Sequence, residues 1–216
     1  MNVGNPSRDA LISLRQELLA EHNTWHSSSL WIPRNSHSAI QSWILPLSDG
    51  RIPLVRAESI LNCSASVLFD YLVTNIDDTC REWNDLMIYS GRIKSFGDGM
   101  ELSRVISEGN VFADREDVFW RGVMELESGS LLELSQGVGT DLVPVYTDIS
   151  TYTQRSLLHF ASKEIVPMTS GQCVYKTIWH YDPAGWLSRL VPHRWLGHFI
   201  LKNLIHEHQK LAVIFD

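Results

Sequence analysis

Short runs of alternating apolar and polar residues, separated by glycine-containing turns, fill the chain from about residue 88 to residue 181. Alternation with a period of two is typical of strands, and short turns connect neighbouring strands in antiparallel order. The predicted strands are Ile88–Phe96, Glu101–Glu108, Asp117–Glu127, Leu131–Gly137, Ser156–Ile165 and Gln172–Tyr181. The runs Gln41–Leu47 and Ile52–Leu61 flank Asp49-Gly50, a strong hairpin signal, and add two more strands. The pattern therefore predicts an antiparallel sheet.

Helical patterns lie at both ends of this strand-rich region and between its two parts. Ser7 and Ser64 are suitable N-terminal caps, and Pro192 is expected to kink or restart the last helix. The predicted helices run from Ser7 to about Glu21, from Ala65 to Val73, from Asp77 or Asp78 to about Leu86, and from Gly185 to about Leu211. Helices at the ends of an antiparallel sheet indicate an α+β fold. We expect one domain over residues 1–216, with an N-terminal helix and loop (1–40) and a core (41–216).

The charge and the cysteine content restrict the class of partner and the compartment. A formal net charge of −7 does not provide the basic face that nucleic acid requires, so we expect no nucleic-acid partner. The three cysteines are scattered and form no C-x-x-C pair, which predicts neither a disulfide framework nor a zinc site. The first residues lack a signal-peptide pattern, and no apolar run approaches the roughly 20 residues of a membrane span. We therefore expect a cytoplasmic location.

The common motifs of enzyme catalysis are missing from the sequence. It contains no G-x-S-x-G, no phosphate-binding loop, no G-x-G-x-x-G and no H-E-x-x-H. His22 and His26 have helical spacing, but no third ligand accompanies them, so we expect surface histidines. Glu116 and Asp117 are adjacent on a predicted strand and must point to opposite faces, which excludes an acid–base pair. We expect no catalytic residue, no metal and no cofactor.

Three short segments, spaced in order along the chain, resemble one protein family. The first is Cys80–Asp85, the second is Gly109–Arg121 and the third is Tyr181–Gly185. They are similar to the R-x-x-W-D helix, the G-N-x-x-x-P-R-D-[FY]-V-x-x-R stretch and the D-P-G-G turn of the START (steroidogenic acute regulatory-related lipid transfer) family. The resemblance covers roughly residues 43 to 216 and implies a helix-grip fold, in which a curved sheet wraps around the C-terminal helix. It also implies a lipid ligand in an internal tunnel.

The resemblance implies where the polar part of a ligand binds. In sterol-handling members, an Arg at the position of Arg121 lies in the cavity opposite an acidic residue, and an ungapped alignment places that acid one position from Glu101. Asn84 replaces the family's Asp, and Arg81 lies one residue nearer to Trp83 than the family's Arg. In phosphatidylcholine-binding members this Arg and this Asp help to hold the headgroup. The departures therefore argue against a choline lipid.

Strand periodicity indicates which faces meet the ligand. The last strand carries its aromatic side chains on one face, which makes that face the better cavity wall, although an ordinary aromatic core needs the same residue types. On the strand Asp117–Glu127, hydrophobicity alone turns Trp120 inward, whereas the family turns Arg121 inward. We adopt the family orientation, which requires a cover over Trp120, such as the N-terminal helix. The candidate ligand-binding residues are Arg121, Arg115, Phe119, Glu101, Trp83, Asn84, Tyr175, Trp179 and Tyr181.

The C-terminal segment carries a local positive charge. From Gly185 to Leu211 it holds four basic residues and one acid, a net charge of +3 in a chain of −7. Its Trp and Phe residues interleave with leucines, and a basic amphipathic helix with Trp at its edges suits a membrane interface. A core-packing helix with a solvated basic face is the plainer alternative. The candidate membrane-docking residues are Trp186, Arg189, Arg194, Trp195 and Lys202.

The principal hypothesis is a monomeric lipid carrier or lipid sensor that binds one phospholipid or sterol and contacts membranes transiently. We expect the final helix and the long loop Val138–Arg155 to open during lipid exchange. A hydrolase or cyclase on the same scaffold is the alternative, and it predicts an acid–base pair in the tunnel. A third alternative, a protein-interaction domain with a vestigial cavity, predicts a tunnel filled with Trp side chains.

Overall fold

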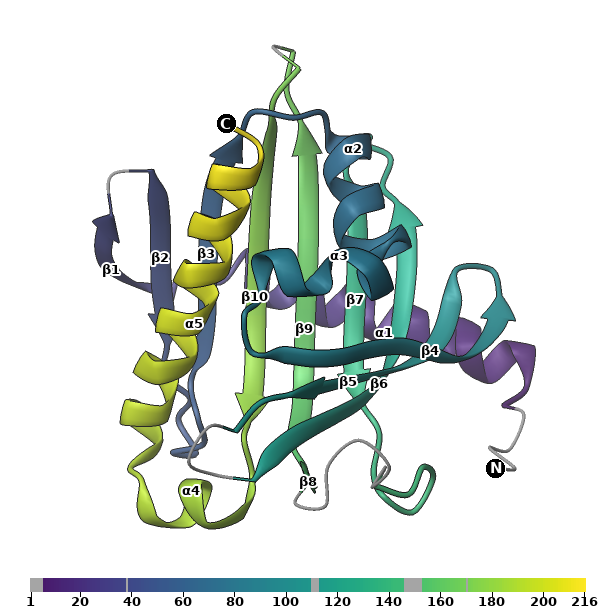
Figure 1. The fold of residues 1–216 in the computed structure, drawn as a ribbon, viewed down its shortest axis with the longest axis vertical. Helices are drawn as coiled ribbons and strands as arrows, with labels where there is room; N and C mark the ends of the chain where they lie inside the picture. Colours follow the sequence, from purple (N-terminus) through teal and green to yellow (C-terminus); the bar gives the residue numbers. More distant parts are fainter. Residues whose placement is uncertain (1–5, 38, 110–112, 146–152, 170) are drawn as a thin grey trace.

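A ten-stranded β-sheet forms the body of the molecule (Figure 1). The computed structural model describes residues 6–37, 39–109, 113–145, 153–169 and 171–216. The strands are β1 (Ile32–His37), β2 (Ile40–Leu45), β3 (Leu54–Leu61), β4 (Met87–Gly97), β5 (Met100–Ser107), β6 (Asp114–Glu125), β7 (Leu131–Gly137), β8 (Thr153–Arg155), β9 (Leu157–Pro167) and β10 (Cys173–Asp182). Their order is β1-β2-β3-β10-β9-β7-β6-β5-β4, antiparallel throughout, and β8 pairs in parallel with β6.

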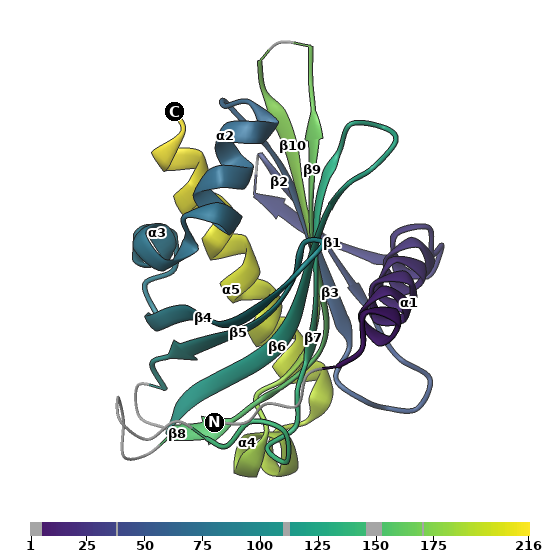
Figure 2. The ribbon, with the colours of Figure 1, turned by 90° about the vertical axis from the view of Figure 1, so that its right-hand side faces the viewer.

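The helices lie on both faces of this sheet. They are α1 (Arg8–His26), α2 (Ala65–Phe69), the π-helical turn η1 (Asp70–Thr74), α3 (Ile76–Trp83), α4 (Gly185–Leu190) and α5 (His193–Ile214). Figure 2 shows α1 on one face and α2, α3 and α5 on the other, toward which β4, β5 and β6 bend. The predicted α+β, helix-grip architecture is therefore confirmed. Among the described residues, no helix combines the length and the apolar character needed to cross a membrane.

The structure corrects several predicted element boundaries. α1 continues past Glu21 to His26, and the segment predicted as a loop contains β1, which pairs with β2. The predicted helix over 65–73 is an α-helical turn followed by the π-helical turn η1. β8 lies inside the predicted long loop, whose residues 146–152 fall outside the described part of the chain. Local patterns missed β1 because its sequence, IPRNSH, does not alternate between apolar and polar residues. They missed β8 because it has only three residues and pairs with the distant strand β6.

Alternation along the central strands gives the sheet two buried faces. On the α1 side, Leu18 packs in one cluster with Leu134, Phe160 and Ile178. On the α5 side, Leu196, Ile200, Leu201 and Leu204 pack against apolar residues of β2 and β3. Each fully buried Leu or Ile stabilises the fold by about 1.5–3 kcal/mol relative to an exposed one. The two clusters hold α1 and α5 against opposite faces of one sheet.

The prediction that His22 lies at the surface is wrong. His22 is only 4% exposed, because it continues the buried stripe of α1 that Leu11 and Leu18 begin. Its ring lies 5.5 Å from that of His26. The spacing of four residues from Leu18 would have indicated this orientation. The described part of the chain contains no group of three or more His, Cys, Asp or Glu side chains placed to hold a metal ion.

Two adjacent polar residues fix α5 on the sheet. The imidazole of His208 is fully buried, and its two ring nitrogens form hydrogen bonds with Ser59 Oγ at 2.8 Å and Thr177 Oγ1 at 2.9 Å. The hydroxyl of Tyr175 donates to Glu207 Oε1 at 2.9 Å, and the Tyr175 ring stacks on His208. Buried polar groups tolerate few alternative partners. These bonds therefore set the register of α5 against β3 and β10.

Acid should weaken the fold below about pH 6.5. Burial lowers the pKa of His208 to about 3 and those of His22 and His180 to about 4. The unfolded chain binds protons at these histidines where the folded chain does not, so stability is full above about pH 6.5 and is lost as the pH falls toward these values. Urea titrations should show a loss of up to about 1.4 kcal/mol per pH unit for each histidine.

The variant His208→Gln isolates the contribution of one histidine. Glutamine keeps hydrogen-bonding groups near Ser59 and Thr177 but does not titrate. Unfolding of the variant in acid should therefore take up about one proton fewer than unfolding of the parent, which makes its unfolding free energy less dependent on pH. Burial also raises the pKa of Asp117 to about 6, so protonation of this carboxyl favours the folded state as the pH falls. This contribution opposes that of the histidines and is the same in both proteins. Identical pH dependence in the two proteins would contradict the prediction.

Candidate functional site

A cavity of about 210 Å³ lies between the sheet, α3 and α5. Most of the wall area is apolar, and side chains from β4, β5, β6, β7, β9 and β10 and from both helices form it. The apolar lining residues are Ile76, Trp83, Leu86, Met87, Val105, Phe119, Leu158, Ala161 and Trp179. The polar lining residues are Asn84, Ser107, Asp117, Glu133, Ser135, Lys163, Tyr181, Asn203, His206 and Glu207. A largely apolar hollow with a few polar groups is the usual form of a small-molecule site.

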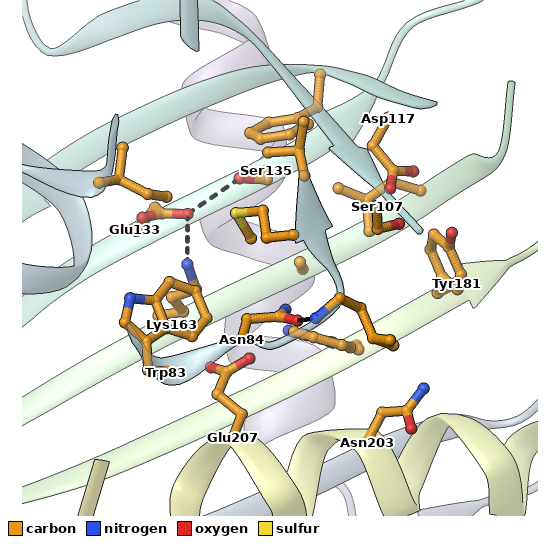
Figure 3. Close-up of a pocket in the computed structure, with 18 of the residues that line it drawn as sticks. Trp83, Asn84, Ser107, Asp117, Glu133, Ser135, Lys163, Tyr181, Asn203 and Glu207 are labelled. Carbon is orange, nitrogen blue, oxygen red and sulfur yellow. Dashed lines mark hydrogen bonds and ion pairs between the residues drawn. The ribbon is translucent and has the colours of Figure 1, made fainter. Parts of the chain in front are cut away.

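Figure 3 shows two groups of polar side chains on different sides of the cavity, one with Glu133 and Lys163 and one with Asp117 and Tyr181. At the first end, Lys163 Nζ lies 3.5 Å from Glu133 Oε1 and 5.5 Å from the centre of the Trp83 ring. Ser135 Oγ donates to Glu133 Oε1 at 3.4 Å. Glu207 points toward Trp83 from α5, and burial raises the pKa of its carboxyl. We call Glu133, Lys163 and Glu207 the acid–lysine cluster.

The second end is formed around Asp117 and Tyr181. Ser156 Oγ donates to Asp117 Oδ1, yet burial is the larger influence and raises the pKa of Asp117 to about 6. Burial and the nearby Asp117 carboxyl also raise the pKa of Tyr181, so its phenol stays protonated. Ser107 lies beside Asp117 in Figure 3. This end therefore offers hydroxyl groups and one readily protonated carboxyl.

Five of the predicted ligand-binding residues line the cavity. They are Trp83, Asn84, Phe119, Trp179 and Tyr181. Two others lie elsewhere: Tyr175 is buried against α5, and Arg115 is buried with its Nη1 donating to the carbonyl of Ala113. Tyr175 lies outside the cavity wall because its side chain contacts Glu207 and His208 of α5 directly. Contact between any of these residues and a ligand remains a prediction.

Arg121 and Glu101 form a buried ion pair outside the main cavity. They stand opposite each other on β6 and β5, with 2.5 Å between Arg121 Nη2 and Glu101 Oε1. Arg121 also donates to the carbonyl of Val73 at 3.2 Å. The side chains of Ile76 and Phe119 stand between this pair and the cavity, because each borders both. The pair therefore ties η1 to the sheet.

The strand β6 turns its Phe119 face toward the cavity, as the family orientation required. Trp120 packs with Leu102, Val138 and Val143 on the other face. The expected cover for Trp120 was the N-terminal helix, and this is wrong, because residues 138–143 provide it. Arg155 holds that segment by donating to the carbonyls of Val138 and Val143.

Glu116 anchors the same segment from the sheet. Its carboxylate is fully buried and lies 2.8 Å from Arg104 Nε and 3.1 Å from Arg155 Nη2. Asp117 turns the opposite way, toward the cavity, as adjacent positions on a strand require. The matching segment Gly109–Arg121 includes residues 110–112, which lie outside the described residues.

Four of the five predicted docking residues are exposed on α4 and α5. Trp195 is 61% exposed, and Phe199, one turn further along α5, is 59% exposed. Arg194 and Lys202 on α5 and Arg189 on α4 are exposed as well. The side chain of Trp186 lies outside the described residues. We call Arg189, Arg194, Trp195, Phe199 and Lys202 the aromatic–basic surface.

The acid–lysine cluster was not predicted. Glu133 stands between Leu132 and Leu134 on β7, and Lys163 stands between buried residues on β9. A charged residue in the middle of a strand that is buried on both faces was the available signal. This signal is ambiguous in the sequence, because only the structure shows that α1 covers the Leu132 face and that the Glu133 face lines the cavity between α3 and α5.

Comparison with solved structures identifies the fold. Human StAR-related lipid transfer protein 5 is similar with a TM-score of 0.83 at 14% identity, over 97% of this chain and 98% of that one. Human STARD10 is similar with a TM-score of 0.74 at 13% identity, over 98% of this chain and 82% of that one. A STAR-related lipid transfer protein fragment from Xanthomonas axonopodis is similar with a TM-score of 0.69 at 14% identity, over 87% of this chain and 99% of that one. This chain has the START fold.

The START likeness rests on structure rather than on sequence. No protein-family model matches the chain, and no curated protein is similar to it in sequence. At identities of 13–14%, the solved START domains establish how the chain folds and leave its ligand to be argued from its own residues.

Removal of Arg121 should destabilise the protein strongly. Arg121→Met leaves the buried Glu101 carboxylate with only the half-exposed Arg92 and a hydroxyl as partners, so we expect a loss of about 3 kcal/mol in unfolding free energy. The double variant Arg121→Met/Glu101→Leu should recover much of that loss, because no buried charge then remains. Urea denaturation measures both. A loss below about 1 kcal/mol in the single variant would show that the pair does not hold η1.

Proposed function

We propose that this protein binds one hydrophobic lipid, a sterol or a phospholipid, in the cavity and transfers it between membranes. The observation that carries the proposal is the mostly apolar cavity beneath α5, on a fold that solved lipid transfer proteins share. Burial of apolar ligand surface there would contribute about 25 cal/mol per Å². A cytoplasmic protein with transient peripheral membrane contact fits this role.

Lipid entry requires α5 to move. The cavity of about 210 Å³ is smaller than the roughly 300–1,000 Å³ of typical ligand pockets, so the space must widen around a whole lipid. The outer ties of α5 are weak: His206 and Lys210 pair with Asp85 at 3.2 and 3.1 Å, and all three side chains are exposed. Exposed ion pairs contribute about 0–1 kcal/mol each. We propose that α5 opens on this side.

The aromatic–basic surface supports the membrane part of the proposal. Trp and Phe side chains insert at the boundary between headgroups and acyl chains, and basic residues attract anionic lipids. Trp195, Phe199 and Lys202 lie on the outward face of the same helix that covers the cavity. Docking through this surface would therefore place the gate next to the bilayer.

A filled cavity should not take up lipid. Ala161 lies in the cavity wall on β9, and Ala161→Trp would occupy the space that a ligand needs. We expect lipid uptake from liposomes, measured by native mass spectrometry, to fall at least about tenfold while the circular dichroism spectrum is unchanged. Ala20→Trp on the exposed side of α1 is the matched control. A parent protein that takes up no lipid at all would overturn the proposed function.

Charge reversal on the aromatic–basic surface should slow transfer. Arg194→Glu/Lys202→Glu replaces attraction to anionic vesicles by repulsion, so the transfer rate between anionic vesicles should fall about tenfold or more, with lipid capacity unchanged. The control Arg8→Glu/Arg34→Glu makes the same charge change on α1 and β1. Equal rates for the two double variants would place the docking surface elsewhere.

An enzyme acting on a hydrophobic molecule is a second candidate function, and one observation favours it. The cavity holds the acid–base groups that this alternative predicts: Glu133 beside Lys163, and Asp117 with a pKa raised to about 6. The two functions differ in the fate of the ligand. Lipid recovered chemically unchanged after prolonged incubation supports the carrier, and a new product mass supports the enzyme.

Trp83 and Trp179 line the cavity without filling it, which argues against a vestigial cavity in a protein-interaction domain.

A further inference from the structure

The acid–lysine cluster has more hydrogen-bond acceptors than the protein satisfies. Glu133 is 5% exposed and Glu207 is 2% exposed, and Oε2 of each has no hydrogen-bond partner among the described residues. Figure 3 shows Glu207 reaching from α5 toward the side of the cavity where Glu133 and Lys163 lie. A buried acceptor without a partner costs about 1–3 kcal/mol. A ligand that supplies a donor there would recover this energy.

The charge at this end selects against an anionic ligand group. Lys163 is the only Lys or Arg among the described residues that line the cavity, and its ammonium group already lies 3.5 Å from Glu133 Oε1. Because this ammonium group already pairs with Glu133, the described lining residues offer no further cation to pair with a phosphate. A phosphate would therefore lie next to like charge in a site with little water.

A second ammonium group is also disfavoured at this end. Lys163 Nζ lies above the Trp83 ring, between the strand β9 and the helix α3, and would repel a cationic headgroup. A neutral hydroxyl avoids both conflicts. It can donate a hydrogen bond to either carboxyl oxygen that lacks a partner, and its desolvation cost is small compared with that of a charge.

We infer that the acid–lysine cluster binds the hydroxyl group of a neutral lipid alcohol and rejects lipids that carry a phosphate at this end. The hydroxyl donates to the free oxygen of Glu207 or Glu133. The apolar body of the ligand extends along Phe119, Leu158 and Trp179. This inference rests on the proposed lipid-binding function and narrows its ligand class.

Four probes with one common chain test the assignment. They are dodecan-1-ol, dodecyl methyl ether, dodecyl phosphate and dodecylamine, each titrated against the purified protein in native mass spectrometry. The alcohol should bind about tenfold more tightly than the ether, because only the alcohol can donate a hydrogen bond to the carboxyl group. It should also bind more tightly than the phosphate and the amine. Equal binding of alcohol and ether, or tightest binding of the phosphate or amine, overturns the assignment.

Two single variants locate the preference. Glu207→Gln keeps an acceptor for the Tyr175 hydroxyl but replaces the free oxygen by a donor, and Glu133→Gln does the same beside Lys163. In at least one of the two variants, the affinity for the alcohol should exceed the affinity for the ether by no more than about twofold. Glu164→Gln, on the α1-facing side of β9 and paired with Lys176, is the matched control and should keep the ratio. An unchanged ratio in both variants overturns the assignment.

Failure of the inference and failure of the proposed function give different results. If the protein acquires lipid from liposomes but shows no alcohol preference, the hydroxyl assignment is wrong and lipid binding stands. If it acquires neither liposome lipid nor any of the four probes, the proposed function is wrong and the assignment falls with it. Binding of the alcohol and its loss in the variants support both.

Discussion

The burial of one face of α5 is the interaction on which the rest of the binding architecture depends. Leu196, Ile200, Leu201 and Leu204 pack against β2 and β3, and the His208 imidazole bonds to Ser59 and Thr177 beneath the helix. This contact is strong because it combines apolar burial with polar groups that have few other partners. The cavity lies between α5, α3 and the sheet, and Asn203, His206 and Glu207 border it from α5. The same helix therefore closes the site and supplies Glu207 to it.

Because the sheet is buried on both faces, its charged residues must pair with one another inside the protein. On the α1 side, Glu164 pairs with Lys176. On the α5 side, Glu133 and Lys163 meet at the cavity wall. Around the bend of the sheet, Arg121 pairs with Glu101, and Glu116 pairs with two arginines, so that η1 and residues 138–143 are held in place. Buried charges of this kind stabilise little by themselves, but each makes one arrangement much better than its alternatives.

Much of the fold could be predicted from local patterns. The Asp49-Gly50 hairpin, the run of antiparallel strands and the break at Pro192 follow from periodicity and turn chemistry. The START resemblance correctly predicted that the Phe119 face of β6 turns inward. Prediction was weaker wherever the outcome depended on a distant partner. β8 exists because β6 offers it hydrogen bonds, and Tyr175 lies under α5 because Glu207 and His208 of that helix contact it.

The sequence alone indicated the type and order of most elements, which residues share a face of each predicted strand, and the basic, aromatic character of the C-terminal helix. These features follow from spacing within a few residues, since side chains that are two apart on a strand, or three to four apart on a helix, share a face. The tertiary structure alone decided that Glu133, Lys163 and Glu207 meet in one cavity, and that Arg121 ties down η1 outside it. Those contacts join residues that lie 30 or more positions apart, and only the packing of three elements brings them within reach.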